Sequence, residues 1–237
     1  MGLAVPIAGL GLVLLLLEAR ETLAGTHFLC LNFTVRSLPL PGQSWSETQC
    51  SVDGMLFLYY DRDNKKATPI GVLGEKAENT RTWKDLANNI EQIEQDLRVI
   101  LFLFDFDKSL RKIPYSLQAQ MCCQGEEGLC TGASWEFSVN GQTALIDTMT
   151  MRWMFVDKGL LKFKRQLDNN KIMSNYFRKV SVQDCNHWLK GFLVYWEKIL
   201  DSTASSKAEE TIQHYPSTWL ITWIMPIITL LSYLTFC

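Results

Sequence analysis

Residues able to carry out chemistry are few in this 237-residue chain, and their spacing does not favour catalysis. His27, His187 and His214 are its three histidines, and none falls in a Cys/His, Ser/His/Asp, HExxH or phosphate-loop pattern. Asp105 and Asp107 imitate a pair of catalytic carboxylates, but an FDFD stretch better fits the capped or solvated end of a helix. We therefore expect no enzyme, no cofactor and no metal site.

Cysteines are the second chemical feature, and they indicate an exported protein. Six of the seven lie between residues 26 and 204, and the seventh is Cys237. An even number of cysteines in an exported chain is typical of disulfides. Asn32-Phe33-Thr34 is an N-glycosylation sequon, so Asn32 is expected to carry a glycan. Because 23 basic residues nearly balance 25 acidic ones, no nucleic-acid partner is expected.

Apolar segments at both ends indicate export and attachment to a membrane. The run from Leu3 to Leu17 precedes small residues at Ala24 and Gly25, which predicts a signal peptide over 1–25, with a buried helix as the alternative. Residues 219–237 carry no charge and follow a polar spacer over 202–218. This pattern predicts a glycolipid-anchor signal, with attachment at Ala204 or Ser202, removal of the tail and a place on the outer cell surface. A tail-inserted span and a soluble form are the alternatives.

The elements between these ends repeat one order, strands and then a helix. Apolar residues alternate over 29–35, as expected of a strand with one buried face. Apolar residues then recur every three or four positions from Trp83 to Phe104, which predicts an amphipathic helix. The second half has strands after Pro114 and helix from Gly159, interrupted near Asn169–Lys171. We predict an α+β fold with halves at 26–113 and 114–201, whose antiparallel sheet carries two long helices on one face.

The cysteines fit this layout in part. Cys123 lies on the apolar face of its strand and Cys185 on the apolar stripe of the last helix, so this pair would join helix to sheet. Cys30 and Cys50 lie on neighbouring strands and could pair. Cys122 and Cys130 flank the GEEG turn and could also pair, although other connectivities stay open.

Several stretches resemble the ULBP/RAET family of MHC class I-like proteins. They are HFLCLNFTV, PGQSW, FLYYD, LGEKAENTRTW, WEFSVNGQTALIDT, MRWMFVDKG and SVQDCNHWLKGFLVYWEKILD. The resemblance implies a class I-type platform with α1-like and α2-like halves, no α3 domain, and no need for β2-microglobulin or a presented peptide. It also implies a glycolipid-anchored ligand for the homodimeric natural killer group 2 member D receptor, which promotes cytotoxicity by natural killer and T cells.

The cysteines also differ from those of the family. ULBP-like members carry a bridge between two cysteines at the places held here by Ser46 and Arg62. Cys30 and Cys50 instead match a bridge of RAET-like members, and the pair Cys123 and Cys185 matches the family's helix-to-sheet bridge. Cys122 and Cys130 have no counterpart in the family.

The receptor of this family sits across the two helices, so the expected contacts are polar or large residues off the buried stripes. The candidates are Glu91, Glu94, Gln95, Arg98 and Phe102 on the first helix, and Lys164, Asp168, Lys171, Ile172 and Asn175 on the second. An ordinary solvated helix face is the alternative for each residue. A carrier of lipid or another small ligand, held between the helices, is the alternative for the whole protein.

Overall fold

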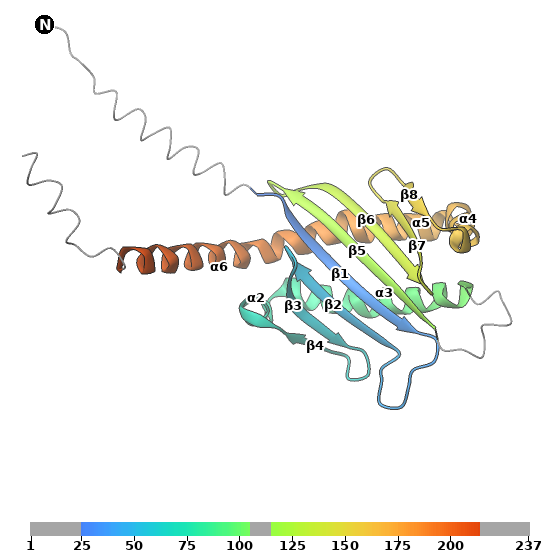
Figure 1. Cartoon of the computed structure of the whole chain (residues 1–237), viewed down its shortest axis with the longest axis horizontal. Helices are drawn as coiled ribbons and strands as arrows, with labels where there is room; N and C mark the ends of the chain where they lie inside the picture. Colours follow the sequence, from blue (N-terminus) through green and yellow to red (C-terminus); the bar gives the residue numbers. More distant parts are fainter. Residues whose placement is uncertain (1–24, 105–114, 214–237) are drawn as a thin grey trace, which may run out of the picture. The chain divides into compact units, whose positions relative to one another are not determined.

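A computed structural model describes residues 25–104 and 115–213, with side chains described over 25–101 and 115–200. These residues form one antiparallel sheet of eight strands in the order β4-β3-β2-β1-β5-β6-β7-β8 (Figure 1). The strands are β1 (His27–Arg36), β2 (Ser46–Val52), β3 (Met55–Asp61), β4 (Lys66–Pro69), β5 (Ser116–Glu126), β6 (Leu129–Val139), β7 (Gln142–Asp147) and β8 (Arg152–Val156). Each half therefore contributes four strands that are neighbours in the sheet.

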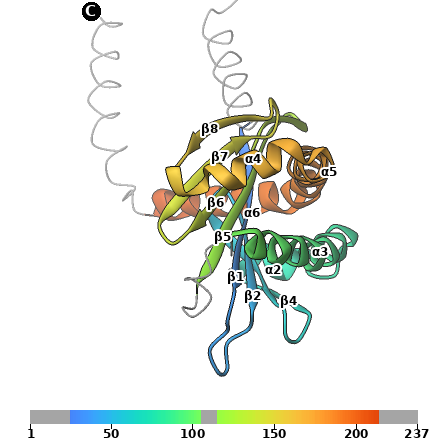
Figure 2. The same ribbon diagram turned by 90° about the vertical axis from the view of Figure 1, so that its right-hand side faces the viewer.

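Helices follow each set of strands and cover one face of the sheet (Figure 2). They are α2 (Gly71–Ala77), α3 (Arg81–Phe104), α4 (Leu161–Asn169), α5 (Lys171–Arg178) and α6 (Cys185–Gln213), with a 3₁₀ turn η2 (Lys158–Leu160) and a π-helical turn η3 (Lys179–Asp184). The predicted α+β arrangement is confirmed, and so is the interruption near Asn170. The chain divides into two compact units, 1–195 and 196–237, and the first contains the sheet.

The apolar side chains that alternate along β1 lie at the centre of the core. Leu29, Leu31, Phe33 and Val35 are buried, as predicted, while the residues between them face the other side of the sheet. On the second half, the buried rings of Trp135 and Phe177 pack edge to face with centroids 4.9 Å apart. Burying such apolar surface is the main force that holds the helices on the sheet.

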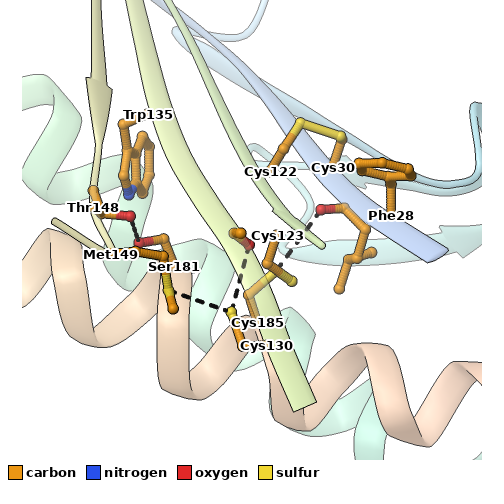
Figure 3. The surroundings of a disulfide bond; sticks show 12 residues. Phe28, Cys30, Cys122, Cys123, Cys130, Trp135, Thr148, Met149, Ser181 and Cys185 are labelled. Carbon is orange, nitrogen blue, oxygen red and sulfur yellow. Dashed lines mark hydrogen bonds between the residues drawn. A yellow bond between two sulfur atoms is a disulfide. The ribbon is translucent and has the colours of Figure 1, made fainter. Parts of the chain in front are cut away.

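Two disulfides join β5 to its neighbours (Figure 3), and one of them corrects the predicted pairing. The bridge Cys123–Cys185 is present as expected and ties the sheet to α6. Cys30 is bonded to Cys122, because these residues lie directly opposite each other in the β1–β5 register. The predicted pair Cys30–Cys50 is wrong, since Cys50 lies opposite Leu31 on the buried face of the sheet, whereas Cys30 points to the other face.

The second predicted pair, Cys122–Cys130, is also wrong. Cys122 faces Ser134 across the β5–β6 hairpin, whereas Cys130 faces Gly125 nearer the turn. Cys130 is instead a free thiol whose Sγ lies 3.8 Å from Met149 Sδ, and Cys50 is a free and buried thiol. Burial raises the pKa of both thiols.

A close contact between α3 and α6 joins the helices on top of the sheet. Gly191 of α6 faces Thr82 of α3, and a Cβ on Gly191 would lie only 2.4 Å from Thr82 Oγ1. Beside this contact, Trp188 Nε1 donates a hydrogen bond of 2.9 Å to Asp85 Oδ2. Only glycine permits the helices to approach so closely at this point.

We expect two free thiols within the part of the chain that the structure describes. Unreduced protein treated with iodoacetamide should be modified at Cys130 first and at Cys50 only after unfolding in urea, because Cys50 is completely buried. Mass spectrometry of the two cysteine-containing peptides measures this. The pairings Cys30–Cys50 and Cys122–Cys130 would instead leave neither peptide modified.

Gly191→Ala should lower the free energy of unfolding by about 1–3 kcal/mol, as overpacking usually does. The loss should exceed the gain of up to about 1 kcal/mol that alanine brings to a helix interior. Thr82→Ala in the same protein should recover most of the loss, because it removes the atoms that the new methyl group meets. Urea unfolding of both single variants and the double variant forms the cycle, and a Gly191→Ala protein as stable as wild type would contradict the contact.

Candidate functional site

The candidate site is the outward surface of α3, α4 and α5, which we call the helical face. Exposed side chains recur on α3 at Asn88, Gln92, Gln95 and Val99, so this stripe is opposite the buried residues that contact the sheet. The 24 residues of α3 form one uninterrupted helix, whereas the opposite side consists of the two short helices α4 and α5.

Glu94, one of the predicted contacts, does not belong to the helical face. Its side chain is 0% exposed, and its Oε1 accepts a hydrogen bond of 2.7 Å from Thr48 Oγ1 of β2. Arg62 Nη1 lies 3.9 Å from Glu94 Oε2. Burial raises the pKa of this carboxyl group, so Glu94 is a structural residue beneath α3 and not a surface contact.

Glu91 and Arg98 lie on the flank of α3 that faces the strand loops. Glu91 forms ion pairs with Lys65 at 2.8 Å and with Arg62 at 3.2 Å, and the hydrogen bond from Lys65 contributes most to lowering its pKa. The Arg98 guanidinium lies 4.6 Å from the ring centroid of Trp45, in cation–π geometry. Of the α3 candidates whose side chains are described, only Gln95 projects outward without such a partner. The side chain of Phe102 lies outside the described residues.

The candidates on the other side of the helical face also fall into two groups, one on the flank of α4 and one exposed on α5. Lys164 pairs with Asp168, and Asp168 accepts a hydrogen bond of 2.8 Å from Trp153 Nε1, so both lie on the flank of α4 near β8. Lys171, Ile172 and Asn175 are exposed on α5. Ile172 is 85% exposed, which is unusual for an isoleucine of a folded domain.

A break at Asn170 brings Ile172 to this position. Asn170 leaves the helical region with φ −101° and ψ 86°, and its side chain accepts a hydrogen bond of 3.1 Å from Met173 N, which caps α5. Ser174 Oγ donates to Leu167 O at 2.7 Å and fixes the junction from the other side. The chain restarts in a new helix whose first turn presents Lys171 and Ile172 to solvent.

A hollow of about 530 Å³ lies between α3 and α5 and contains residues that the sequence did not single out. Val99 is 56% exposed on its α3 side, opposite Ile172 and Met173 of α5. Burial and a hydrogen bond with Asp96 raise the pKa of Tyr176, so this phenol joins α5 to α3. The sequence could have indicated the α3 residues of this hollow. Gln92, Asp96 and Val99 are spaced at i, i+4 and i+7 and so share one helix face, and each directly follows one of the candidates Glu91, Gln95 and Arg98.

The remaining predicted sites lie elsewhere. Asn32 is exposed on the face of the sheet opposite the helices, where Gln120 Nε2 donates to its Oδ1 at 2.7 Å. Ser202 and Ala204 lie within α6, and their side chains are outside the described residues. Residues 1–24 of the predicted signal peptide, residues 214–218 of the spacer and the whole predicted tail, 219–237, also lie outside them. None of the described helices is both long and apolar enough to cross a membrane.

Comparison with known proteins agrees with this architecture. Residues 25–195 match the family described as class I histocompatibility antigen, NKG2D ligand, domains 1 and 2. The chain is 37% identical to human retinoic acid early transcript 1E over 238 residues, which cover 98% of this chain and 90% of that protein. It is 34% identical to human UL16-binding protein 1 over 179 residues, or 75% of this chain and 73% of the relative. Sheet, helices and sequence together assign the chain to the NKG2D-ligand family of MHC class I-like proteins.

Proposed function

We propose that this protein is a cell-surface ligand of the natural killer group 2 member D receptor, NKG2D, and that binding promotes cytotoxicity by natural killer and T cells. The family description, which names NKG2D ligands, supports the receptor. The receptor homodimer lies across the helical face, with one subunit over α3 and the other over α5. A glycolipid at Ser202 or Ala204 attaches the protein to the cell surface, and binding requires neither β2-microglobulin nor peptide.

The observation that carries this proposal is the exposed apolar surface on both sides of the hollow. Ile172 and Val99 are 85% and 56% exposed, respectively, and both line the same hollow. Such side chains are costly to leave in water and are typical centres of protein interfaces when polar groups surround them. Gln95, Lys171 and Asn175 supply that polar surround on the two helices.

Packing between the helices argues against the alternative, a carrier of lipid or another small ligand. A carrier needs a groove that separates its helices, but α3 and α6 meet at Thr82 and Gly191. Trp188 is buried and bonded to Asp85, and it fills space in which a ligand would lie. The hollow near Ile172 lies between α3 and α5 beside exposed side chains of both helices, so it is accessible to a protein partner.

The sheet's other face is suited to a glycan and not to the receptor. Asn32 of the sequon is exposed there, on β1. A glycan at this position would stand away from α3 and α5, because the sheet separates it from the helices. Glycosylation and receptor binding are therefore compatible in one molecule.

Ile172→Ala should weaken receptor binding by about tenfold or more, as loss of a central apolar anchor does. Fluorescent soluble receptor homodimer would be titrated on cells expressing the full chain with an epitope tag, and binding would be normalised to the tag. Met154→Ala is the matched control, because Met154 is 68% exposed on the edge strand β8 and should have no effect. Equal binding by wild type and both variants would reject this site. No binding by well-expressed wild type would reject the receptor.

Arg98→Ala should have a much smaller effect, no more than about threefold, in the same titration. The Arg98 guanidinium already contacts Trp45, so it would have to leave this stacking to reach a partner. Val99→Ala, at the next position of the same helix, is the comparison and should weaken binding more than Arg98→Ala. The reverse order would place the contact surface on the outer flank of α3.

A further inference from the structure

Charge is distributed very unevenly over α4, α5 and the turns beside them. Residues 158–179 contain seven cations and one acid: Lys158, Lys162, Lys164, Arg165, Lys171, Arg178, Lys179 and Asp168. The whole chain carries a formal net charge of −2, so this concentration is local and not a consequence of composition. Four of the cations fall within the eight residues KGLLKFKR, a density typical of segments that bind polyanions.

The carboxylates of this region are already occupied. Asp157 accepts a hydrogen bond from Thr143 N at 2.7 Å, and Asp168 is bound by Lys164 and Trp153. Asp184 pairs with Lys179 at 2.7 Å. Two cations are thereby neutralised, while Asp157, whose partner is a backbone N–H group, keeps its charge next to Lys158 in the chain.

Besides Lys162, which has an interaction of its own, four exposed cations form no ion pair among the described residues: Lys158, Arg165, Lys171 and Arg178. Lys171 and Arg178 are seven residues apart within α5 and so lie on one face of that helix, whereas Lys158 lies in the turn η2 and Arg165 in α4. Phe163, Leu167 and Phe177 are buried, so the cations point away from the sheet. We call these four residues the basic stripe.

We propose that the basic stripe binds a linear sulfated polysaccharide of the heparan sulfate type. The four cations lie on η2, α4 and α5, which follow one another in the chain but change direction at Asn170, where the helix is broken (Figure 2). Cations spread over consecutive elements match a chain that carries many sulfate groups better than a compact ligand with one anionic group. Asn169 and Asn175 are exposed between the cations and offer hydrogen bonds to hydroxyl and sulfate oxygens.

The side chains suit sulfate groups for physical reasons. Arg165 and Arg178 each present a planar donor fork that can bind two oxygens of one sulfate, while Lys158 and Lys171 act as mobile point charges. Binding to a highly charged polymer releases its counterions, so affinity depends on the number of stripe cations and falls steeply with salt. The polysaccharide and not an acidic protein is favoured because four cations fall within the eight residues KGLLKFKR, a density typical of heparin-binding patches.

Heparin is the probe for this proposal. The full chain, solubilised in mild detergent, would be applied at pH 7.4 to heparin resin and to sulfopropyl resin of matched charge density. Retention on heparin to a higher salt concentration than on the sulfopropyl resin is expected despite the net negative charge. The combined variant Arg165→Gln, Lys171→Gln and Arg178→Gln should lose at least about tenfold in heparin affinity.

A second triple variant tests whether heparin affinity depends on the basic stripe or only on the total number of cations. Lys66→Gln, Lys76→Gln and Lys190→Gln removes three exposed cations from β4, α2 and α6, and should elute from heparin like wild type. Equal losses in both variants, or equal retention on both resins, would reduce the effect to nonspecific ion exchange and overturn the proposal. A stripe variant that loses receptor binding but keeps its heparin affinity would assign the stripe to an acidic protein surface. Thermal unfolding of each variant checks its fold.

Discussion

The pleat of β5 is the constraint on which the rest of this structure depends. Successive side chains of a strand point to opposite faces, so the adjacent residues Cys122 and Cys123 cannot serve the same side. Cys122 is bonded to Cys30 on the face of the sheet without helices, and Cys123 is bonded to Cys185 of α6 on the covered face. β5 is thus covalently joined both to its neighbour strand and to the layer above it. These links connect the two halves at the middle of the sheet, where β1 and β5 pair.

The helices of the helical face are held by contacts that start from these two disulfides. The start of α6 is fixed by Cys185, and three residues later Trp188 bonds to Asp85 of α3. Near the other end of α3, Asp96 meets Tyr176 of α5. These contacts hold α3 against α6 and α5, and the second of them lies at the hollow that contains Val99 and Ile172. Contacts of this kind reduce the entropy that a partner must overcome on binding.

Periodicity in the sequence was enough to predict the sheet, its burial alternation along β1 and the break between α4 and α5. It could not predict the pairing of Cys30, because this depends on β1 lying beside β5, a contact between residues 92 positions apart. Nor does periodicity give the local bonds at helix starts. Thr80 Oγ1 accepts a hydrogen bond from Trp83 N, and Ser181 is buried in a π-helical turn, where it bonds to Thr148. Among the surface candidates, Glu94 was misassigned because a buried carboxylate and an exposed one look alike in a helical pattern.

Burial of Glu94 is tied to Arg62, which follows β3 and lies beside the start of β2. Glu47 faces Asp61 in the β2–β3 register, so Ser46 and Arg62 are cross-strand neighbours as well. With no covalent link there, Arg62 reaches both Glu91 and Glu94 and also lies 5.1 Å from the ring centroid of Trp45. A buried carboxylate is costly unless paired, so Glu94 and Arg62 depend on each other. The ionic cluster thus fastens α3 to β2 and to the end of β3. Arg98, stacked on the same Trp45, extends the cluster along α3, and for this reason one side of that helix is a structural flank while the other remains available for a partner.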